Sequence, residues 1–360
     1  MIENNPIHHS LFLKAIRKEA IPRTPAWIMR QAGRYLPEYR KTRARAGDFL
    51  SLCKTPELAC EVTLQPLQRF TLDAAIVFSD ILTIPDAMQL GLSFQDGEGP
   101  VFERPLRSPT DIQALPQTPL LEELDYVMQA IKLVRHSMPA HIPLIGFSGS
   151  PWTLACYMIE GKSSKDFKQT LQLLYNDPQS MHALLNCLKI QINAYLEAQI
   201  NAGANAIMLF DTWGGILTPQ NYQHFSLFYM KEIIQHLKRM HPTTPIILFT
   251  KGGGQWLEEI ALSGCDVLGL DWTTDLKQAR QRVGQKVALQ GNLDPSVLLS
   301  SPSCIRAQVQ QMLASYGAGS GHIANLGHGI TPDVPPEHVE VFLQALQEFS
   351  PAYHPAKDAL

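Results

Sequence analysis

The chain has 360 residues and a formal net charge of −3, with 45% hydrophobic and 18% charged residues. This composition is typical of a folded globular protein with a large core, and the weak net acidity argues against nucleic-acid binding. No apolar run approaches the roughly 18 residues of a membrane span, and the N-terminus has no secretory hydrophobic region. The six cysteines lack paired spacing, which predicts reduced thiols in a cytoplasmic protein.

Basic residues are concentrated near the N-terminus. Residues 14–45 contain ten basic and two acidic side chains, a third of all Lys and Arg in the chain. Arginine forks match carboxylates and phosphates geometrically, so this cluster predicts a site for a polyanion. A solvated helix face is the alternative explanation. The breaks at Gly33 and Pro37 argue against a plain surface helix.

Short apolar runs alternate with stretches of helical periodicity along the chain. The eight strand candidates are Ala26–Met29, Ala74–Phe78, Leu144–Phe147, Ala206–Phe210, Ile246–Phe249, Val267–Leu270, Val287–Leu289 and Ile323–Leu326. The clearest helix candidates are Ser180–Asn201, Asn221–Met240 and Ser303–Tyr316. The alternation predicts a parallel α/β sheet. An open doubly wound sheet would give the same alternation, but eight repeats favour a closed (β/α)₈ TIM-type barrel.

The domain organisation is predicted to be simple. No low-complexity linker divides the chain, so residues 1–360 are expected to form a single barrel domain. One stretch breaks the alternation: Leu92–Leu106, which contains Asp96-Gly-Glu-Gly-Pro100, predicts a hairpin inserted after the second strand.

Each strand candidate is followed by polar or glycine-rich residues. In chain order these are Arg30, Ser79-Asp80, Ser148–Trp152, Asp211–Gly215, Lys251–Gly254, Asp271-Trp272, Asn292–Asp294 and Gly327–Gly329. Barrel enzymes keep their active sites at the carboxyl ends of the strands, so this pattern predicts the site there. Asp80 would be held rigidly at the mouth by its strand, although it could instead be the N-cap of a helix starting near Ile81.

Several other motifs do not fit their usual functions. Gly317-Ala-Gly-Ser-Gly321 precedes a strand candidate, whereas a dinucleotide fingerprint follows one. Lys251 at a strand end could be a Schiff-base lysine, as in barrel aldolases. No His-containing segment has the spacing of metal ligands, so no metal site is predicted.

Five segments together resemble one family. Residues 29–40, Met-Arg-Gln-Ala-Gly-Arg-Tyr-Leu-Pro-Glu-Tyr-Arg, resemble the N-terminal signature of the uroporphyrinogen decarboxylase family. Gly146–Tyr157 resembles the second signature of that family. Phe78–Leu82, Gln290–Pro295 and Asn325–Ile330 match it further along, so the resemblance extends over essentially the whole chain. Corrinoid-linked methyltransferases of the same superfamily have a zinc-binding His-x-Cys where this chain reads Thr250-Lys-Gly-Gly.

The resemblance implies a barrel-shaped lyase that works as a cytoplasmic homodimer without cofactor. Its substrate would be uroporphyrinogen III, whose four acetate side chains are decarboxylated to give coproporphyrinogen III and carbon dioxide for haem biosynthesis. Eight substrate carboxylates require cationic partners, because an unpaired buried charge is costly. Arg30, Arg34 and Arg43 are suited to this task, and the backbone amides around Gln31, Ala32 and Gly33 would add donors.

The resemblance also implies roles for side chains at other strand ends. Asp80 would face the pyrrole N–H groups and stabilise the cationic intermediate. Tyr157 and His328 would contact the substrate, and Thr212 would donate a hydroxyl hydrogen to a carboxylate. The proton donor stays open between Arg30, Tyr157 and a bound water.

A non-catalytic tetrapyrrole-binding scaffold on the same barrel is the alternative from another functional class. Such a protein would keep the arginines and could lose Asp80, whereas this chain keeps both.

Overall fold

The computed structural model describes residues 6–95 and 99–354. Seven parallel strands form one curled sheet in the order β1-β4-β5-β6-β7-β8-β9. Their bounds are Ala75–Ile76 (β1), Leu144–Gly149 (β4), Ala206–Asp211 (β5), Ile246–Thr250 (β6), Val267–Gly269 (β7), Ala288–Gln290 (β8) and His322–Ile323 (β9). Every residue of β4, β5 and β6 is buried. This burial explains why these strands read as continuous apolar runs.

The segment predicted as the first strand, Ala26–Met29, closes the barrel without being a regular strand. Ala26 makes an isolated parallel bridge with Ala324 beside β9. On the other side, the Ala26 carbonyl accepts the N–H of Asp73 at 2.8 Å, just before β1. Side chains replace the missing strand ladder, because the N–H groups of Ala26 and Met29 donate to the side chains of Asp73 and Asn325. The strand prediction was therefore wrong in detail, although the segment lies where an eighth strand would.

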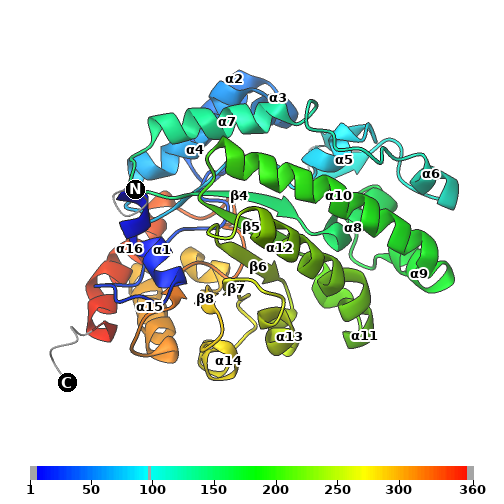
Figure 1. The fold of residues 1–360 in the computed structure, drawn as a ribbon. Coiled ribbons are helices and arrows are strands. Elements are labelled where there is room, and N and C mark those ends of the chain that lie inside the picture. The colour runs from blue at the N-terminus through cyan, green and yellow to red at the C-terminus, as the bar shows by residue number, and fades with distance from the viewer. Residues whose placement is uncertain (1–5, 96–98, 355–360) are drawn as a thin grey trace.

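Helices surround the sheet, as Figure 1 shows for α4, α7, α10, α12, α13, α14, α15 and α16. Their bounds are Leu11–Ile16 (α1), Pro37–Ala46 (α2), Phe49–Lys54 (α3), Pro56–Arg69 (α4), Thr83–Ala87 (α5), Pro109–Gln113 (α6), Asp125–Ser137 (α7), Pro151–Glu160 (α8), Lys168–Asn176 (α9), Pro178–Ala202 (α10), Pro219–Asn221 (α11), Phe228–Met240 (α12), Leu257–Ala261 (α13), Leu276–Val283 (α14), Pro302–Tyr316 (α15) and Pro336–Phe349 (α16). Together, sheet and helices confirm the (β/α)₈ prediction. No helix in the described ranges is long and apolar enough to cross a bilayer.

Local sequence explains where the long helices begin. Proline occupies the first helical position of α8, α10 and α15, where its missing N–H costs nothing. The preceding Ser150, Asp177 and Ser301 each accept a hydrogen bond from a backbone N–H three residues later. The helices predicted at 180–201 and 303–316 are confirmed. The third, 221–240, is interrupted by a π-helical stretch at Tyr222–Leu227.

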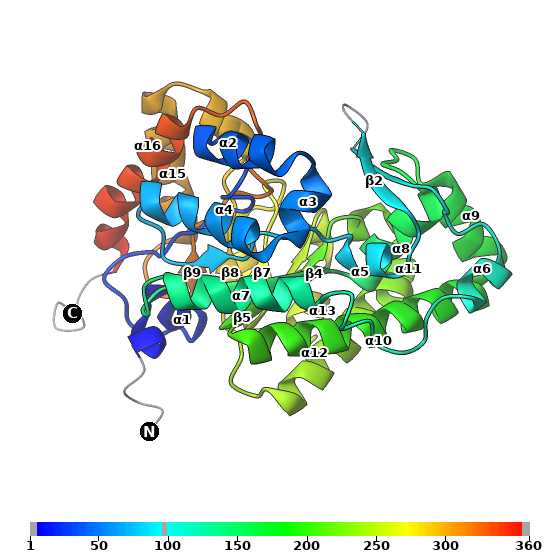
Figure 2. The same cartoon turned by 90° about the horizontal axis from the view of Figure 1, so that it is seen from above.

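The predicted hairpin is present after β1 and α5. Strands β2 (Leu92–Gln95) and β3 (Gly99–Phe102) are antiparallel, with Leu92 opposite Phe102. The hairpin projects from the body of the molecule in Figure 2. Its expected turn at residues 96–98 lies outside the described residues.

Candidate functional site at the carboxyl ends of the strands

Arg30 begins a tight turn with an unusual backbone. Its φ of 65° lies in the left-handed region, which a residue other than glycine adopts at a cost of about 1–3 kcal/mol. Hydrogen bonds hold the turn on both sides of it: Gln31 donates its N–H to the Ile28 carbonyl at 2.8 Å, and Ile330 donates to the Met29 carbonyl at 3.0 Å. The exposed Arg30 side chain is thereby placed on a rigid backbone.

Gln31 is buried and its side chain is used within the fold. Its Oε1 accepts the Ile28 N–H, and its Nε2 donates to the Ala74 carbonyl at 3.4 Å. The Gln31 carbonyl accepts the hydroxyl of Tyr35 at 2.8 Å. Ala32 and Gly33 are partly exposed, and no partner for their N–H groups occurs in the described structure.

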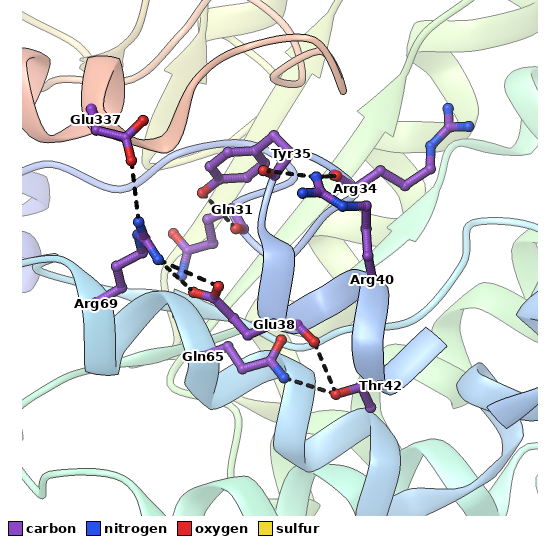
Figure 3. A network of polar contacts seen from close by, with 9 residues as sticks. All are labelled: Gln31, Arg34, Tyr35, Glu38, Arg40, Thr42, Gln65, Arg69 and Glu337. Carbon is purple, nitrogen blue, oxygen red and sulfur yellow. Dashed lines mark hydrogen bonds and ion pairs between the residues drawn. The ribbon is translucent and has the colours of Figure 1, made fainter. Parts of the chain in front are cut away.

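Arg40 and Arg69 make contacts that hold this region of the fold together, whereas the side chain of Arg34 points elsewhere (Figure 3). Arg40 donates to the carbonyl oxygens of Arg34 and Tyr35 at 2.7 and 3.2 Å. Arg69 reaches Glu38 in α2 and Glu337 in α16, which ties three helices together. The Arg34 side chain extends away from this network.

The arginines predicted to bind the substrate have no acidic partners. Across residues 6–95 and 99–354, no ion pair involves Arg30, Arg34 or Arg43. Arg43, half-buried on α2, donates only to the Gly47 carbonyl at 2.8 Å. By contrast, Arg45 on the same helix pairs with Glu61. All three guanidinium groups, which form no ion pair within the described residues, remain available for external anions.

Asp80 is partly buried and retains a free oxygen. Its Oδ1 accepts the Leu82 N–H at 2.8 Å, while Oδ2 has no hydrogen-bond donor among the described residues. The α5 helix begins only at Thr83, so Asp80 stabilises a turn and is not the helix N-cap that was considered from the sequence. Burial raises the pKa of Asp80 to about 6, and the nearby positive charge of Arg30 limits this rise.

Electrostatic interactions show that the predicted residues converge. Asp80 and Arg30 both act on the pKa of Tyr157, which burial raises. Tyr39, whose pKa burial raises to about 12, is influenced by Arg43, Arg34 and Asp80. The basic segment and the end of β1 therefore face one region.

Tyr157 and Thr212 come from neighbouring strand ends. Tyr157 lies on α8, directly after β4, and its ring centroid is 6.1 Å from that of Trp213. Thr212 is partly exposed and follows Asp211 at the end of β5. Asp211 is fully buried and accepts hydroxyl hydrogens from four residues, which join the ends of β4, β5 and β6. These four donors are Ser150, Thr153, Ser226 and Thr250.

His328 lies in the loop after β9, where the neighbouring Gly329 packs against the side chain of Arg30. Burial, together with the positive charges of Arg30 and Lys251, lowers the pKa of His328 to about 4. The ring centroids of Phe249 and Trp272 are 6.1 and 6.3 Å from that of His328. The lowered pKa favours the neutral ring near pH 7, which has one N–H donor and one nitrogen acceptor.

From the sequence, Trp213 and Trp272 were named only as strand-end residues, and the one role considered for Lys251 was that of a Schiff-base lysine. Their position after three successive strands was the sequence signal that could have indicated a shared function. No cluster of three or more His, Cys, Asp or Glu side chains that could hold a metal occurs in the described part of the chain.

Comparison with known proteins gives concordant matches. A family model described as Uroporphyrinogen decarboxylase (URO-D) matches residues 8–349. A protein named uroporphyrinogen decarboxylase from Legionella pneumophila (strain Paris) is 64% identical over 348 residues, 97% of this chain and 99% of the relative. A protein of the same name from Tolumonas auensis is 57% identical over 350 residues, with the same coverage. A methyltransferase structure from Methanosarcina mazei has a TM-score of 0.80 at 19% identity and covers 94% of this chain and 99% of its own. That likeness supports the fold alone.

Proposed function

The chain belongs to the uroporphyrinogen decarboxylase family and is a carboxy-lyase of porphyrin and haem biosynthesis, and from this we propose that Asp80 and Arg30 are its catalytic residues. The observation that carries the proposal is the burial and hydrogen bonding of the Asp80 carboxylate. It is a partly buried carboxylate after β1 whose Oδ2 has no hydrogen-bond donor among the described residues, and its charge acts on Tyr157 together with that of Arg30.

The substrate explains why cations are needed at this site. Uroporphyrinogen carries an acetate and a propionate on each of its four pyrroles. Arg30, Arg34 and Arg43 lack acidic partners in the described structure and can form two-pronged contacts with carboxylates. The N–H groups of Ala32 and Gly33, which have no partner in the part of the chain that the structure describes, can add neutral donors. We assign Gln31 to holding this turn, because its side chain is buried and already hydrogen-bonded.

The proposed chemistry uses the substrate as its own electron sink. Protonation of a pyrrole ring carbon creates a cation beside the acetate side chain. The bond between the acetate methylene and its carboxylate then breaks, carbon dioxide leaves, and the bonding electrons neutralise the ring. Protonation of the methylene and loss of the added ring proton leave a methyl group.

Asp80 acts on the charge that develops during this sequence. Its free Oδ2 can accept hydrogen bonds from the pyrrole N–H groups, and its negative charge stabilises the ring cation. Electrostatic stabilisation of a developing charge by a preorganised group is usually the largest catalytic term. Tyr157, Thr212 and His328 complete the proposed binding site by contacting the side chains of the macrocycle.

Anaerobic incubation of the purified protein with uroporphyrinogen tests this function. Chromatography of the oxidised products should show porphyrins with seven, six, five and finally four carboxylates. Unchanged substrate that is nevertheless bound would instead indicate a tetrapyrrole-binding scaffold. Repeating the assay with an Asp80→Asn variant tests whether the proposed catalytic group is needed.

We also propose that the enzyme is a single-domain homodimer in the cytoplasm. Five of its six cysteines are buried free thiols, which suits a reducing compartment. The dimer rests on the family resemblance. Sedimentation of the full chain at micromolar concentration tests it, because a monomer throughout would contradict the proposal.

A further inference from the structure

We propose that Lys251 is a further substrate-binding residue, which holds a carboxylate on the side of the macrocycle away from Arg30. The inference rests on the function proposed above. It assigns a substrate carboxylate to the Lys251 ammonium group, which has no role in the function proposed above.

Two indole rings hold the Lys251 ammonium group in place. Its Nζ lies 5.7 Å from the ring centroid of Trp213 and 5.7 Å from that of Trp272. Trp213 follows β5, Lys251 follows β6 and Trp272 follows β7, so three adjacent strands supply the arrangement. The π faces attract the positive charge, but they leave the N–H donors of the ammonium free for hydrogen bonds.

Close backbone packing fixes the loops that carry these side chains. A Cβ on Gly215 would overlap the Lys251 carbonyl oxygen and lie 3.0 Å from the Gly252 Cα. A Cβ on Gly327 would lie 2.9 Å from the Trp272 Cα. The loop after β5 thus rests on the loop after β6, and the His328 loop rests on the Trp272 loop.

The carboxylates of Asp211 and Asp271 near Lys251 already accept hydrogen bonds from other residues. The buried Asp271 accepts the N–H of Thr273 at 2.9 Å and its hydroxyl at 2.6 Å, and it also accepts the Gly252 N–H. Four hydroxyl groups surround the carboxylate of Asp211. Neither forms an ion pair with Lys251, although other partly buried lysines such as Lys238 do pair with a carboxylate.

The half-buried Lys251 therefore has no acidic partner in residues 6–95 and 99–354. A charge that is partly removed from water is stabilised when a counter-ion lies nearby. A carboxylate that arrives with the substrate would supply that counter-ion, which is the role already argued for the unpaired arginines.

The position of β6 in the barrel makes Lys251 complementary to Arg30. From the Ala26 segment, β6 is reached after β1, β4 and β5 in one direction and after β9, β8 and β7 in the other. Arg30 and Lys251 hence follow opposite elements of the ring, with His328 influenced by both charges. A macrocycle with carboxylates around its whole periphery can meet a cation on each side.

Steady-state kinetics on Lys251→Met and Lys251→Arg tests the inference. Methionine keeps the apolar stem between the indoles but removes the charge, so we expect KM for uroporphyrinogen to rise about tenfold or more, as for the loss of a charged hydrogen bond. Arginine should restore part of the affinity. The matched control is Lys277→Met on the exposed face of α14, which should leave KM unchanged.

The product pattern identifies the carboxylate. If Lys251 holds a propionate, KM should rise for uroporphyrinogen and for every partly decarboxylated intermediate. If it holds an acetate, one intermediate should accumulate selectively. An unchanged KM in Lys251→Met, or a fall in kcat alone, would overturn the inference.

A covalent adduct at Lys251 after borohydride treatment with substrate would also overturn it. Should the methionine variant unfold below the assay temperature, Lys251→Gln is measured in its place under the same criteria. The two proposals can fail separately. If the wild-type protein gives the series of porphyrins with seven to four carboxylates while the Lys251 variant keeps its KM, only the inference about Lys251 is overturned.

Discussion

Arg30 lies directly against Gly329, so closely that no larger residue fits at position 329 without moving the arginine. A Cβ on Gly329 would lie 2.9 Å from both Cγ and Nε of Arg30 and still closer to Cδ. This contact joins the turn after the Ala26 segment to the loop of His328. It also limits the directions that the exposed guanidinium group can take.

Gly329→Ala should consequently impair activity more than stability. The φ of Gly329 lies outside the left-handed region, and the overlapping atoms belong to a flexible side chain that can move into solvent. We expect kcat/KM to fall about tenfold or more, as for a displaced charged contact, with the melting temperature little changed. Kinetics and thermal unfolding measured on the same preparation check this. Wild-type kcat/KM in the alanine variant would show that the position of Arg30 is unimportant.

Substitutions of Asp80 should separate catalysis from local structure. Asn keeps an oxygen for the Leu82 N–H but removes the charge, so turnover should fall by about 10²–10³, as for other preorganised electrostatic contacts. Glu keeps the charge on a longer side chain and should retain some activity. Turnover of the Asn, Glu and Ala variants provides the comparison. A fully active Asn variant would limit Asp80 to stabilising its turn.

The raised pKa of Asp80 predicts two pH effects. If the ionised form is required, kcat/KM should rise with pH through an inflection near the pKa of about 6. Because burial favours the protonated form, the native state binds more protons than the unfolded chain from pH 3.8 to about 6. The contribution of Asp80 to stability therefore falls as pH rises through this window. Asp80→Asn should lack this loss, so its melting temperature at pH 8 should equal or exceed that of wild type.

The contribution of His328 to stability should change with pH in the opposite direction to that of Asp80. The pKa of His328 is lowered from 6.5 to about 4, so the native state binds fewer protons than the unfolded chain between these values. The stability linked to His328 is present above pH 6.5 and is lost as pH falls towards 4. His328→Asn should therefore lose less stability than wild type between pH 7 and pH 5, and its activity loss should be milder than that of Asp80→Asn. Thermal unfolding at both pH values, with the exposed His136→Asn as control, measures the difference.

Arg34→Ala and Arg43→Ala should weaken substrate capture without unfolding the protein. Neither guanidinium group has an acidic partner in the described structure, so little folding energy depends on it. KM should rise in both variants, and lysine replacements should recover only part of the loss, because a point charge cannot make a two-pronged contact. Arg45→Ala is the control, since Arg45 is on the same helix but pairs with Glu61. Equal KM values in wild type and both alanine variants would assign the cluster to a solvated surface.

The sequence alone determined most elements, and it also led to the prediction of which face carries the site. Continuous apolar runs such as 206–210 predicted buried parallel strands, because burial on both faces leaves no room for alternation. The helix at 303–316 was predicted from the helical period of its apolar residues. Polar residues after each strand predicted a site at the carboxyl ends of the strands, because parallel barrel strands all end on one face.

Only the tertiary structure decided what individual side chains do in that region. Arg40 and Arg34 look alike in sequence, yet Arg40 holds backbone carbonyls and Arg34 extends outward. The segment at Ala26 has strand-like residues, but distant Asp73 and Asn325 take over its hydrogen bonds. Lys251 meets two tryptophans that follow other strands. Periodicity reports the local environment of a segment, whereas pairings between residues far apart in the chain arise only when the barrel closes and brings the strand ends together.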